Sequence, residues 1–175
     1  MKNILKFLCV ILLMVFSASF ASAQARYDKG DVLLNAGVGL GYYYAGGVPL
    51  LLSAEWAVND VISVGPYFGY TSYSYGYLSG YNFSFIDFGV RGSYHFSELF
   101  EIRNEKIDVY GGAFLGYVVT TYPREFKRYD LDPYPGKVRL GIHAGIRYFF
   151  TESVGGYAEL GAGMAPLALG FSFKL

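Results

Sequence analysis

Eight ionisable side chains fall on the polar faces of segments in which polar or small residues alternate with apolar ones. They are Glu55, Asp87, Arg91, Asp108, Arg139, His143, Arg147 and Glu159. If residues 150–153 form a tight turn, His143 and Glu159 lie about opposite one another, with Arg147 one step away. Such groups could relay protons or form the constriction of a small pore. In the structural alternative, opposite charges on an enclosed face pair with one another, because an unpaired buried charge is costly.

Hydrolytic chemistry has less support in the sequence. An esterase or lipase needs a nucleophile within hydrogen-bond reach of a base that a third group orients. Ser72 and Ser74 lie in a tyrosine-rich connection that contains no histidine. The histidines of the chain, His95 and His143, lie within alternating segments instead. We therefore predict that the protein is not an enzyme.

Motifs for a metal or a cofactor are also missing from the sequence. No His, Cys, Asp and Glu residues cluster at the spacing of metal ligands. Glycine pairs such as Gly37 and Gly39 alternate within one segment and precede no helix, unlike a phosphate-binding loop. We predict neither a cofactor nor a metal.

The clearest structural element is the segment KVRLGIHAGIRYF, Lys137–Phe149. One face carries Val138, Leu140, Ile142, Ala144, Ile146 and Tyr148, and the other carries Lys137, Arg139, Gly141, His143, Gly145, Arg147 and Phe149. Strict alternation over this length predicts a β-strand with one apolar face and one polar or small face.

Seven further segments repeat this alternation. They are Asp31–Tyr44, Pro49–Val58, Val61–Thr71, Phe83–Phe96, Ile107–Thr121, Gly155–Met164 and Leu167–Leu175. Each is about long enough to cross a bilayer at a tilt. An even number of strands lets the first and the last pair, which removes the exposed edges. Within the third segment, Pro66 cannot donate to a ladder, so we expect a β-bulge there.

The composition of the two faces indicates whether water or lipid surrounds the barrel. They carry glycine, aromatic residues and charges, whereas the opposite faces are apolar. A barrel in lipid has its apolar face outside and its polar face in the lumen. The sequence therefore predicts an all-β fold, an eight-stranded antiparallel up-and-down transmembrane β-barrel. Tyr67, Tyr110, Phe114 and Tyr157 also point inward, which favours a lumen filled by side chains.

The N-terminus has the three parts of a secretory signal peptide. Lys2 and Lys6 form the basic region, and residues 7–16 (FLCVILLMVF) form the apolar region. Small residues at 21–23 supply the cleavage site. The apolar run is too short for a membrane-spanning helix, which needs about 20 residues.

Cleavage would divide the chain into a signal peptide, residues 1–23, and one barrel domain, residues 24–175. Cys9 is the only cysteine, so the mature chain would have neither a disulfide nor thiol chemistry. The whole chain has 14 basic and 14 acidic residues. This balance gives no basic excess of the kind that nucleic-acid binding requires.

With these features the chain resembles the small eight-stranded outer-membrane barrels of Gram-negative bacteria, the OmpA transmembrane-domain and OmpX type. The resemblance covers residues 27–175 and rests on the signal peptide, the alternating segments and the ending LALGFSFKL. In that ending, Phe171, Phe173 and Leu175 match the family's assembly signal, although the family usually has an aromatic residue at the position of Leu175. Only the connector 97–106 is longer than the short periplasmic turns of this family.

The resemblance implies a location and partners. It implies a monomeric, multi-pass protein of the bacterial outer membrane that is exported through a Sec-type signal peptide. It also implies contact with outer-membrane lipid, lipopolysaccharide and the barrel-assembly machinery. It implies no single activity.

Two polar connections offer candidate surface sites. Their residues are Tyr73, Tyr75, Tyr77, Arg124, Lys127 and Arg128. The tyrosines could form an adhesive or glycan-binding surface, or they could extend a hairpin and complete an aromatic girdle. The basic residues could meet anionic lipopolysaccharide, or belong to a solvated loop.

We therefore expect a structural or surface-interaction role, such as envelope integrity, adhesion or contact with an unknown surface partner. A narrow porin-like channel for ions or small solutes is the alternative. A membrane-embedded lipid hydrolase ranks third.

Overall fold

The structure is a computed structural model and describes residues 28–41, 47–74, 82–102, 104–121, 136–161 and 163–175. These residues form eight strands: β1 (Val32–Leu40), β2 (Leu50–Asn59), β3 (Ile62–Ser74), β4 (Asn82–His95), β5 (Ile107–Thr121), β6 (Lys137–Phe149), β7 (Val154–Leu160) and β8 (Leu167–Lys174). Each strand overlaps a segment whose alternation predicts one.

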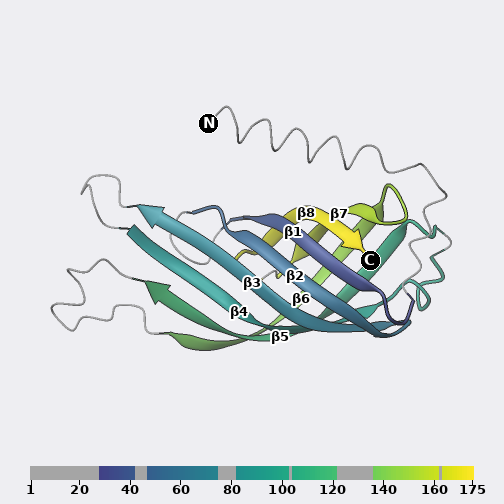
Figure 1. Cartoon of the computed structure of the whole chain (residues 1–175), viewed down its shortest axis with the longest axis horizontal. Coiled ribbons are helices and arrows are strands. Elements are labelled where there is room, and N and C mark those ends of the chain that lie inside the picture. The colour runs from purple at the N-terminus through teal and green to yellow at the C-terminus, as the bar shows by residue number, and fades with distance from the viewer. Residues whose placement is uncertain (1–27, 42–46, 75–81, 103, 122–135, 162) are drawn as a thin grey trace.

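The strands form a closed barrel in which each pairs antiparallel with the next and β1 pairs with β8 (Figure 1). The predicted eight-stranded antiparallel barrel is therefore confirmed. Residues 1–23, the predicted signal peptide, lie outside the described residues. No helix in the described part of the chain is long and apolar enough to cross a membrane.

The barrel has two different ends (Figure 1). At one end, here called the turn end, the chain passes from β2 to β3, from β4 to β5 and from β6 to β7, beside the C-terminus. At the opposite end, the loop end, β1, β3, β5 and β7 end and β2, β4, β6 and β8 begin. Strands β3 to β6 have 13 to 15 residues and extend further toward the loop end than the other four, which have 7 to 10.

The strand bounds agree with the prediction for β5 and β6 and differ most for β1 and β7. β1 ends at Leu40, and residues 42–44 of its predicted segment lie outside the described residues. The predicted segment ran to Met164, but β7 ends at Leu160. Gly161 and Gly163 have φ angles of +75° and +71°, which turn the chain out of the extended conformation. As a result, Met164 and Ala165 are buried inside the barrel and are not part of the strand.

The bulge predicted at Pro66 was wrong. Pro66 pairs in register with Val90 of β4, and the register shift between β2 and β3 lies between Ala57 and Asn59. The ladder to β2 has the same register on both sides of Pro66 and omits only Ala54 and Glu55. A proline has no N–H to donate to the ladder, so it interrupts the pairing without adding a residue.

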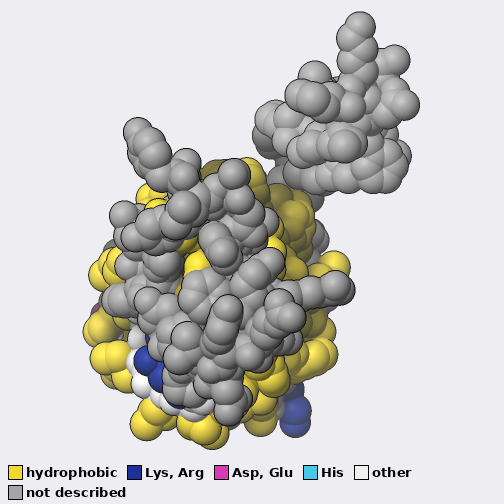
Figure 2. All heavy atoms as spheres, turned by 90° about the vertical axis from the view of Figure 1, so that its left-hand side faces the viewer, with side chains coloured by type: hydrophobic (Ala, Val, Ile, Leu, Met, Phe, Trp, Pro, Cys, Tyr) yellow, Lys and Arg dark blue, Asp and Glu magenta, His cyan; other side chains and the backbone are white. Residues whose placement is uncertain are grey.

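The two faces of the barrel differ as the alternation predicts. Outward side chains such as Leu52, Leu140 and Phe171 are large, apolar and exposed, and Leu140 reaches 80%. Viewed from the loop end, hydrophobic side chains occupy most of the visible rim of the barrel (Figure 2). The inward face instead buries Asn35, Glu55, Asp87 and other polar groups. An apolar exterior around a polar interior is the arrangement of a barrel in lipid.

Apolar clusters lie at both ends of the lumen. The turn-end cap consists of Leu33, Ala57 and Phe149. The loop-end cap consists of Leu51, Phe85, Val118, Tyr157, Met164 and Ala168. Most of the buried polar side chains point into the lumen from the strands, between these two caps.

Inward aromatic rings lie over glycines of other strands. A Cβ atom at Gly145 would lie 2.5 Å from atoms of Tyr110, so that ring occupies the space above the glycine. In the same way the Phe114 ring covers Gly141, and the Tyr67 hydroxyl end covers Gly116. The glycines of the inward face therefore make room for aromatic side chains in a narrow lumen.

Candidate functional site: the lumen network

Arg147 on β6 lies at the centre of the inward charges and is fully buried. The register of β5 and β6 places it opposite Asp108, and its Nη1 donates to Asp108 Oδ2 at 2.7 Å. Its Nη2 lies 3.4 Å from Glu55 Oε1, and its guanidinium carbon lies 3.7 Å from the centre of the Tyr110 ring. Arg147 thereby joins side chains of β2 and β5 across the lumen.

A second chain of contacts leads from Asp108 to His143. Asp108 Oδ1 lies 2.8 Å from His95 Nδ1, and His95 Nε2 lies 3.1 Å from Ser63 Oγ. Ser63 Oγ and Ser93 Oγ both donate to Glu55 Oε2, at 2.9 and 2.5 Å.

The chain ends at His143, whose Nε2 lies 3.0 Å from Ser93 Oγ. The path is therefore a continuous series of polar side chains from β5, β4, β3, β2 and β6.

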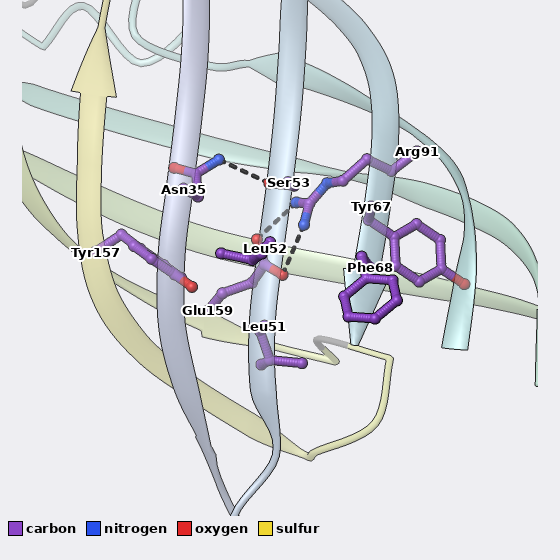
Figure 3. Close-up of a pocket in the computed structure, with 9 residues that line it drawn as sticks. All are labelled: Asn35, Leu51, Leu52, Ser53, Tyr67, Phe68, Arg91, Tyr157 and Glu159. Carbon is purple, nitrogen blue, oxygen red and sulfur yellow. Dashed lines mark hydrogen bonds and ion pairs between the residues drawn. The ribbon is translucent and has the colours of Figure 1, made fainter. Parts of the chain in front are cut away.

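Arg91 of β4 and Glu159 of β7 form a bidentate ion pair (Figure 3). Arg91 Nη1 donates to Oε1 at 3.0 Å, and Nη2 donates to Oε2 at 2.6 Å. Glu159 Oε2 also accepts the Tyr110 hydroxyl at 2.8 Å. Arg91 Nε lies 3.4 Å from Glu55 Oε1, which connects this pair to the Arg147 group. Parallel donors of this kind fix geometry as well as supply attraction.

Nearer the loop end, Arg139 forms a separate group. Its Nη1 donates to Asp87 Oδ2 at 2.7 Å, and Asp87 Oδ1 accepts the Tyr67 hydroxyl at 2.9 Å. Its Nη2 donates to the carbonyl oxygen of Gly163 at 2.8 Å. Arg139 therefore ties the β7–β8 connection to the wall formed by β3 and β4.

The sequence places the eight charged candidates on one face but does not identify all of their partners. The structure adds Asn35, Ser53, Ser63, Tyr67, Ser93, His95, Tyr110 and Ser172 to the network. Asn35, for example, accepts from Ser172 and Arg147 and donates to Ser53. All of these residues share the inward phase of the alternation, which is the signal that could have identified them.

The expected pairing of His143 with Glu159 was wrong. The register of β6 and β7 places Gly145 opposite Glu159, and Arg147 opposite Tyr157. The first paired residues of this hairpin are Phe149 and Gly155, so the turn between them shifts the register by two residues from the expected one. Glu159 therefore pairs with Arg91 of β4, and His143 contacts Ser93.

Two small cavities flank the Arg91–Glu159 pair. The larger, of about 30 Å³, is lined by nine residues drawn in Figure 3, which include Asn35, Ser53 and Tyr157. The smaller, of about 20 Å³, is lined by six residues including His143, whose Nδ1 has no hydrogen-bond partner among the described atoms. Each is large enough for about one water molecule and far too small for an organic ligand.

The Asp108–His95–Ser63 contacts have the order of a hydrolase triad but not its accessibility. All three side chains are buried, and the Ser63 hydroxyl donates to Glu55. A catalytic serine instead gives its proton to the histidine and reaches a substrate. Within the described residues, no group of three His, Cys, Asp or Glu side chains could hold a metal ion.

The remaining candidates lie on the surface or outside the described residues. Phe171 and Leu175 of the predicted assembly signal are exposed, while Phe173 is half-buried. Tyr73 lies near the end of β3. Tyr75, Tyr77, Arg124, Lys127 and Arg128 are outside the described residues.

Comparison with known proteins shows similarity of structure only. No family model matches the sequence, and no curated protein matches it. The crystal structure of the outer membrane protein OprG from Pseudomonas aeruginosa has a TM-score of 0.55 at 13% identity, over 86% of this chain and 98% of OprG. The outer membrane protein Ail of Yersinia pestis, in a phospholipid bilayer nanodisc, has a TM-score of 0.52 at 14% identity, over 84% of this chain and 100% of Ail.

A designed protein, TMB2.3, has a TM-score of 0.53 at 14% identity, over 85% of this chain and 96% of its own. Likeness at such identities concerns the fold alone. The chain has the fold of the small eight-stranded outer-membrane β-barrels.

Proposed function

We propose that this protein is an integral outer-membrane β-barrel with a structural or surface-interaction role. Envelope integrity, adhesion and contact with a partner at the cell surface are the roles in this class. The observation that carries the proposal is a barrel with an apolar exterior and a lumen occupied by buried side chains between two apolar clusters. A packed lumen leaves the outer wall and the loops as the surfaces through which the protein can act.

The exterior supports a membrane location. Outward aromatic side chains gather toward the turn end, where the Tyr94 and Phe96 rings lie 4.9 Å apart and the Tyr148 and Phe150 rings lie 5.8 Å apart. Phe88, in the middle of β4, and Tyr117 of β5 form another outward pair, with ring centres 6.4 Å apart. Aromatic rings gathered at one end of an apolar wall match the aromatic girdle that a transmembrane barrel has at a membrane boundary. OprG and Ail, which share the fold, are both outer membrane proteins.

Export and assembly complete this proposal. Residues 1–23 act as a cleaved Sec-type signal peptide, and residues 24–175 form the mature, monomeric barrel. Its C-terminal strand, with Phe171, Phe173 and Leu175, is the segment that the barrel-assembly machinery binds. The wall contacts outer-membrane lipid, and Arg124, Lys127 and Arg128 contact lipopolysaccharide. The turn end then faces the periplasm.

The lumen network has a structural role in this proposal. Four buried carboxylates, those of Glu55, Asp87, Asp108 and Glu159, are each within 3.4 Å of an arginine nitrogen. Together with the two apolar caps, the network fills the lumen with side chains. The two cavities beside Arg91 are each large enough for about one water molecule and too small for a solute.

The protein is not an enzyme in this proposal. Among the described serines, only Ser63 contacts a histidine which in turn contacts an aspartate, and it is buried within the network. A lipid substrate in the membrane would have no route to it.

Fractionation and conductance test this function. The protein should fractionate with outer membranes, and its mobility in detergent gels should shift on heating. Planar-bilayer recordings should show little conductance. Recovery as a soluble periplasmic protein would contradict the membrane proposal. Stable channels whose conductance changes in Arg147→Ala or Glu159→Ala would instead support a narrow pore.

A further inference from the structure

The connection between β4 and β5 is the longest described connection at the turn end. It runs over residues 96–106, of which residue 103 is not described. Its first part is compact, because Phe100 N donates to Phe96 O and Ile102 N donates to Ser97 O, both at 3.0 Å. Glu101 has a φ angle of +48°, in the left-handed region that is typical of turns. These contacts give residues 97–101 a defined shape.

Two large apolar side chains of this connection are exposed. Leu99 is 64% exposed and Phe100 is 60% exposed. In water, such a pair would leave a large apolar surface unburied at the end of the barrel. Exposed apolar side chains are common on protein surfaces, so this pair alone does not indicate a binding partner.

The aromatic contacts of Phe100 join the apolar surface of Leu99 and Phe100 to the outward face of the barrel. The Phe100 ring stacks on the Phe96 ring with centres 5.4 Å apart and planes at 19°, and Phe96 contacts Tyr94 at 4.9 Å. Tyr94 is an exposed, outward side chain of β4. Phe96 is fixed to the barrel wall, because its ring lies over the outward face of Gly111. The row of three rings therefore extends the outward apolar face beyond the end of β4.

The charges of the same connection are arranged next to this row. Glu98 and Glu101 flank Leu99 and Phe100, and both acidic residues are exposed. A segment with apolar side chains continuous with a lipid-facing wall, and with charges beside them, is suited to a membrane–water boundary. Aromatic rings are enriched at that boundary.

We propose that residues 97–101 form a membrane strap, in which Leu99 and Phe100 insert into the lipid leaflet at the turn end. Glu98 and Glu101 remain in water. The occupant of this apolar surface is phospholipid, because the surface is continuous with the lipid-facing wall through Phe96 and Tyr94. The inference rests on the proposed membrane location, with the turn end at the inner leaflet of the outer membrane.

The single tryptophan, Trp56, makes a direct test possible. Trp56 is an exposed, outward side chain of β2 and reports whether the barrel wall is in lipid. The mature protein would be folded into phospholipid vesicles with or without bromine on the acyl chains, which quenches nearby tryptophan. In a Trp56→Phe background, Phe100→Trp reports on the strap. Glu98→Trp, two residues earlier and at an exposed charged position, is the matched control.

We expect the Phe100→Trp variant to lose most of its fluorescence in brominated vesicles, more strongly with bromine near the headgroup than at the chain ends. The Glu98→Trp variant should keep its fluorescence and respond instead to a quencher dissolved in water. If native Trp56 is quenched but Phe100→Trp is not, the strap is wrong and the membrane barrel stands. If native Trp56 is not quenched either, the proposed membrane location fails. Equal quenching of Phe100→Trp and Glu98→Trp would also overturn the proposed two-sided strap.

Discussion

At the scale of single residues, the lumen is organised by side chains that each contact several strands. Glu55 of β2 accepts from Ser63 of β3 and Ser93 of β4 and lies within 3.4 Å of Arg147 of β6. Its carboxylate is fully buried. Removing one partner of such a group leaves a charge without compensation in a medium of low dielectric constant. The strength of each contact is therefore best measured by deleting its partner.

Arg147→Ala should be strongly destabilising. It removes the donors to Asp108, Glu55 and Asn35 together and leaves two buried carboxylates with fewer partners. We expect the free energy of unfolding to fall by about 3–5 kcal/mol. Equilibrium unfolding by urea in lipid vesicles measures this change.

Lys174→Ala is the matched control, because Lys174 Nζ lies 3.9 Å from Asp31 in a partly exposed pair. It should change the free energy of unfolding by less than about 1 kcal/mol. Adding Asp108→Asn to Arg147→Ala should restore part of the loss, since the carboxylate then no longer needs a cation. An Arg147→Ala protein as stable as the Lys174→Ala protein would show that the network contributes little.

Gly145→Ala tests the packing of aromatic rings on glycine. The new Cβ would lie 2.5 Å from Tyr110 and 2.8 Å from the backbone oxygen of Ala158, and the backbone cannot move away easily. We expect a loss of about 1–3 kcal/mol in the free energy of unfolding. Gly92→Ala is the control, because its Cβ would meet nothing closer than 3.6 Å, and it should be neutral within about 0.5 kcal/mol. Equal stabilities of the two variants would contradict the proposed role of the inward glycines.

At the scale of elements, the β7–β8 connection closes the loop end of the lumen. It turns inward at Gly161 and Gly163, and it buries Met164 and Ala165. Met164 lies against Gly69, where a Cβ atom would be 2.6 Å from its sulfur. The hydrogen bond from Arg139 to the Gly163 carbonyl holds this inward conformation against the wall.

Arg139→Ala should loosen that connection. A cysteine at position 165 is a useful probe, because Ala165 is fully buried and the only cysteine of the chain is Cys9, in the predicted signal peptide. With Arg139 present, Ala165→Cys should react slowly with a water-soluble maleimide. In the Arg139→Ala background the reaction should be much faster, because the connection opens more often.

Thr121→Cys serves as the control for reagent access, since Thr121 is exposed at the end of β5. It should react at the same fast rate with and without Arg139. A rate for Ala165→Cys that does not depend on Arg139 would show that the apolar contacts of Met164 alone hold the connection.

The elements also show where sequence reasoning succeeds and fails. The bounds of β6 follow from its alternation, because inward and outward side chains of one strand meet opposite environments. The end of β7 was predicted four residues too late, because alternation continues past the point where Gly161 adopts a positive φ. The register of β6 and β7 also depends on the turn geometry, which the composition of residues 150–153 does not fix.

At the scale of the whole molecule, the pattern of one strand predicts the barrel but not its internal contacts. Arg147 and Asp108 are neighbours in adjacent strands, so a correct register alone brings them together. Arg91 and Glu159 lie on β4 and β7 and meet across the lumen. That contact depends on the tilt and stagger of all the strands together. The outward positions follow from the alternation alone, because every strand presents the same kind of apolar face to the outside.

Closure of the barrel by β1 and β8 is the feature on which the whole molecule depends. Leu34 pairs with Phe173, and Val32 and Leu175 exchange two backbone hydrogen bonds of 3.0 and 2.9 Å. Deleting residues 173–175 removes these pairs and exposes the edge of β1 to lipid, where unpaired backbone groups are costly. We expect no heat-shifted band in detergent gels and no protein in the outer-membrane fraction.

Two control variants distinguish the effect of losing the β1–β8 pairs from the effects of a shorter chain and of a different C-terminal residue. Deleting residues 125–132, which lie outside the described strands, removes more residues but leaves both partners of the β1–β8 pair in place. Leu175→Phe keeps the backbone bonds to Val32 and restores the aromatic end that the family usually has. Both proteins should give the heat-shifted band. If the deletion of residues 173–175 also gives it, β1 and β8 close the barrel without their last pairs, because the pairs from Asn35 to Leu40 are sufficient.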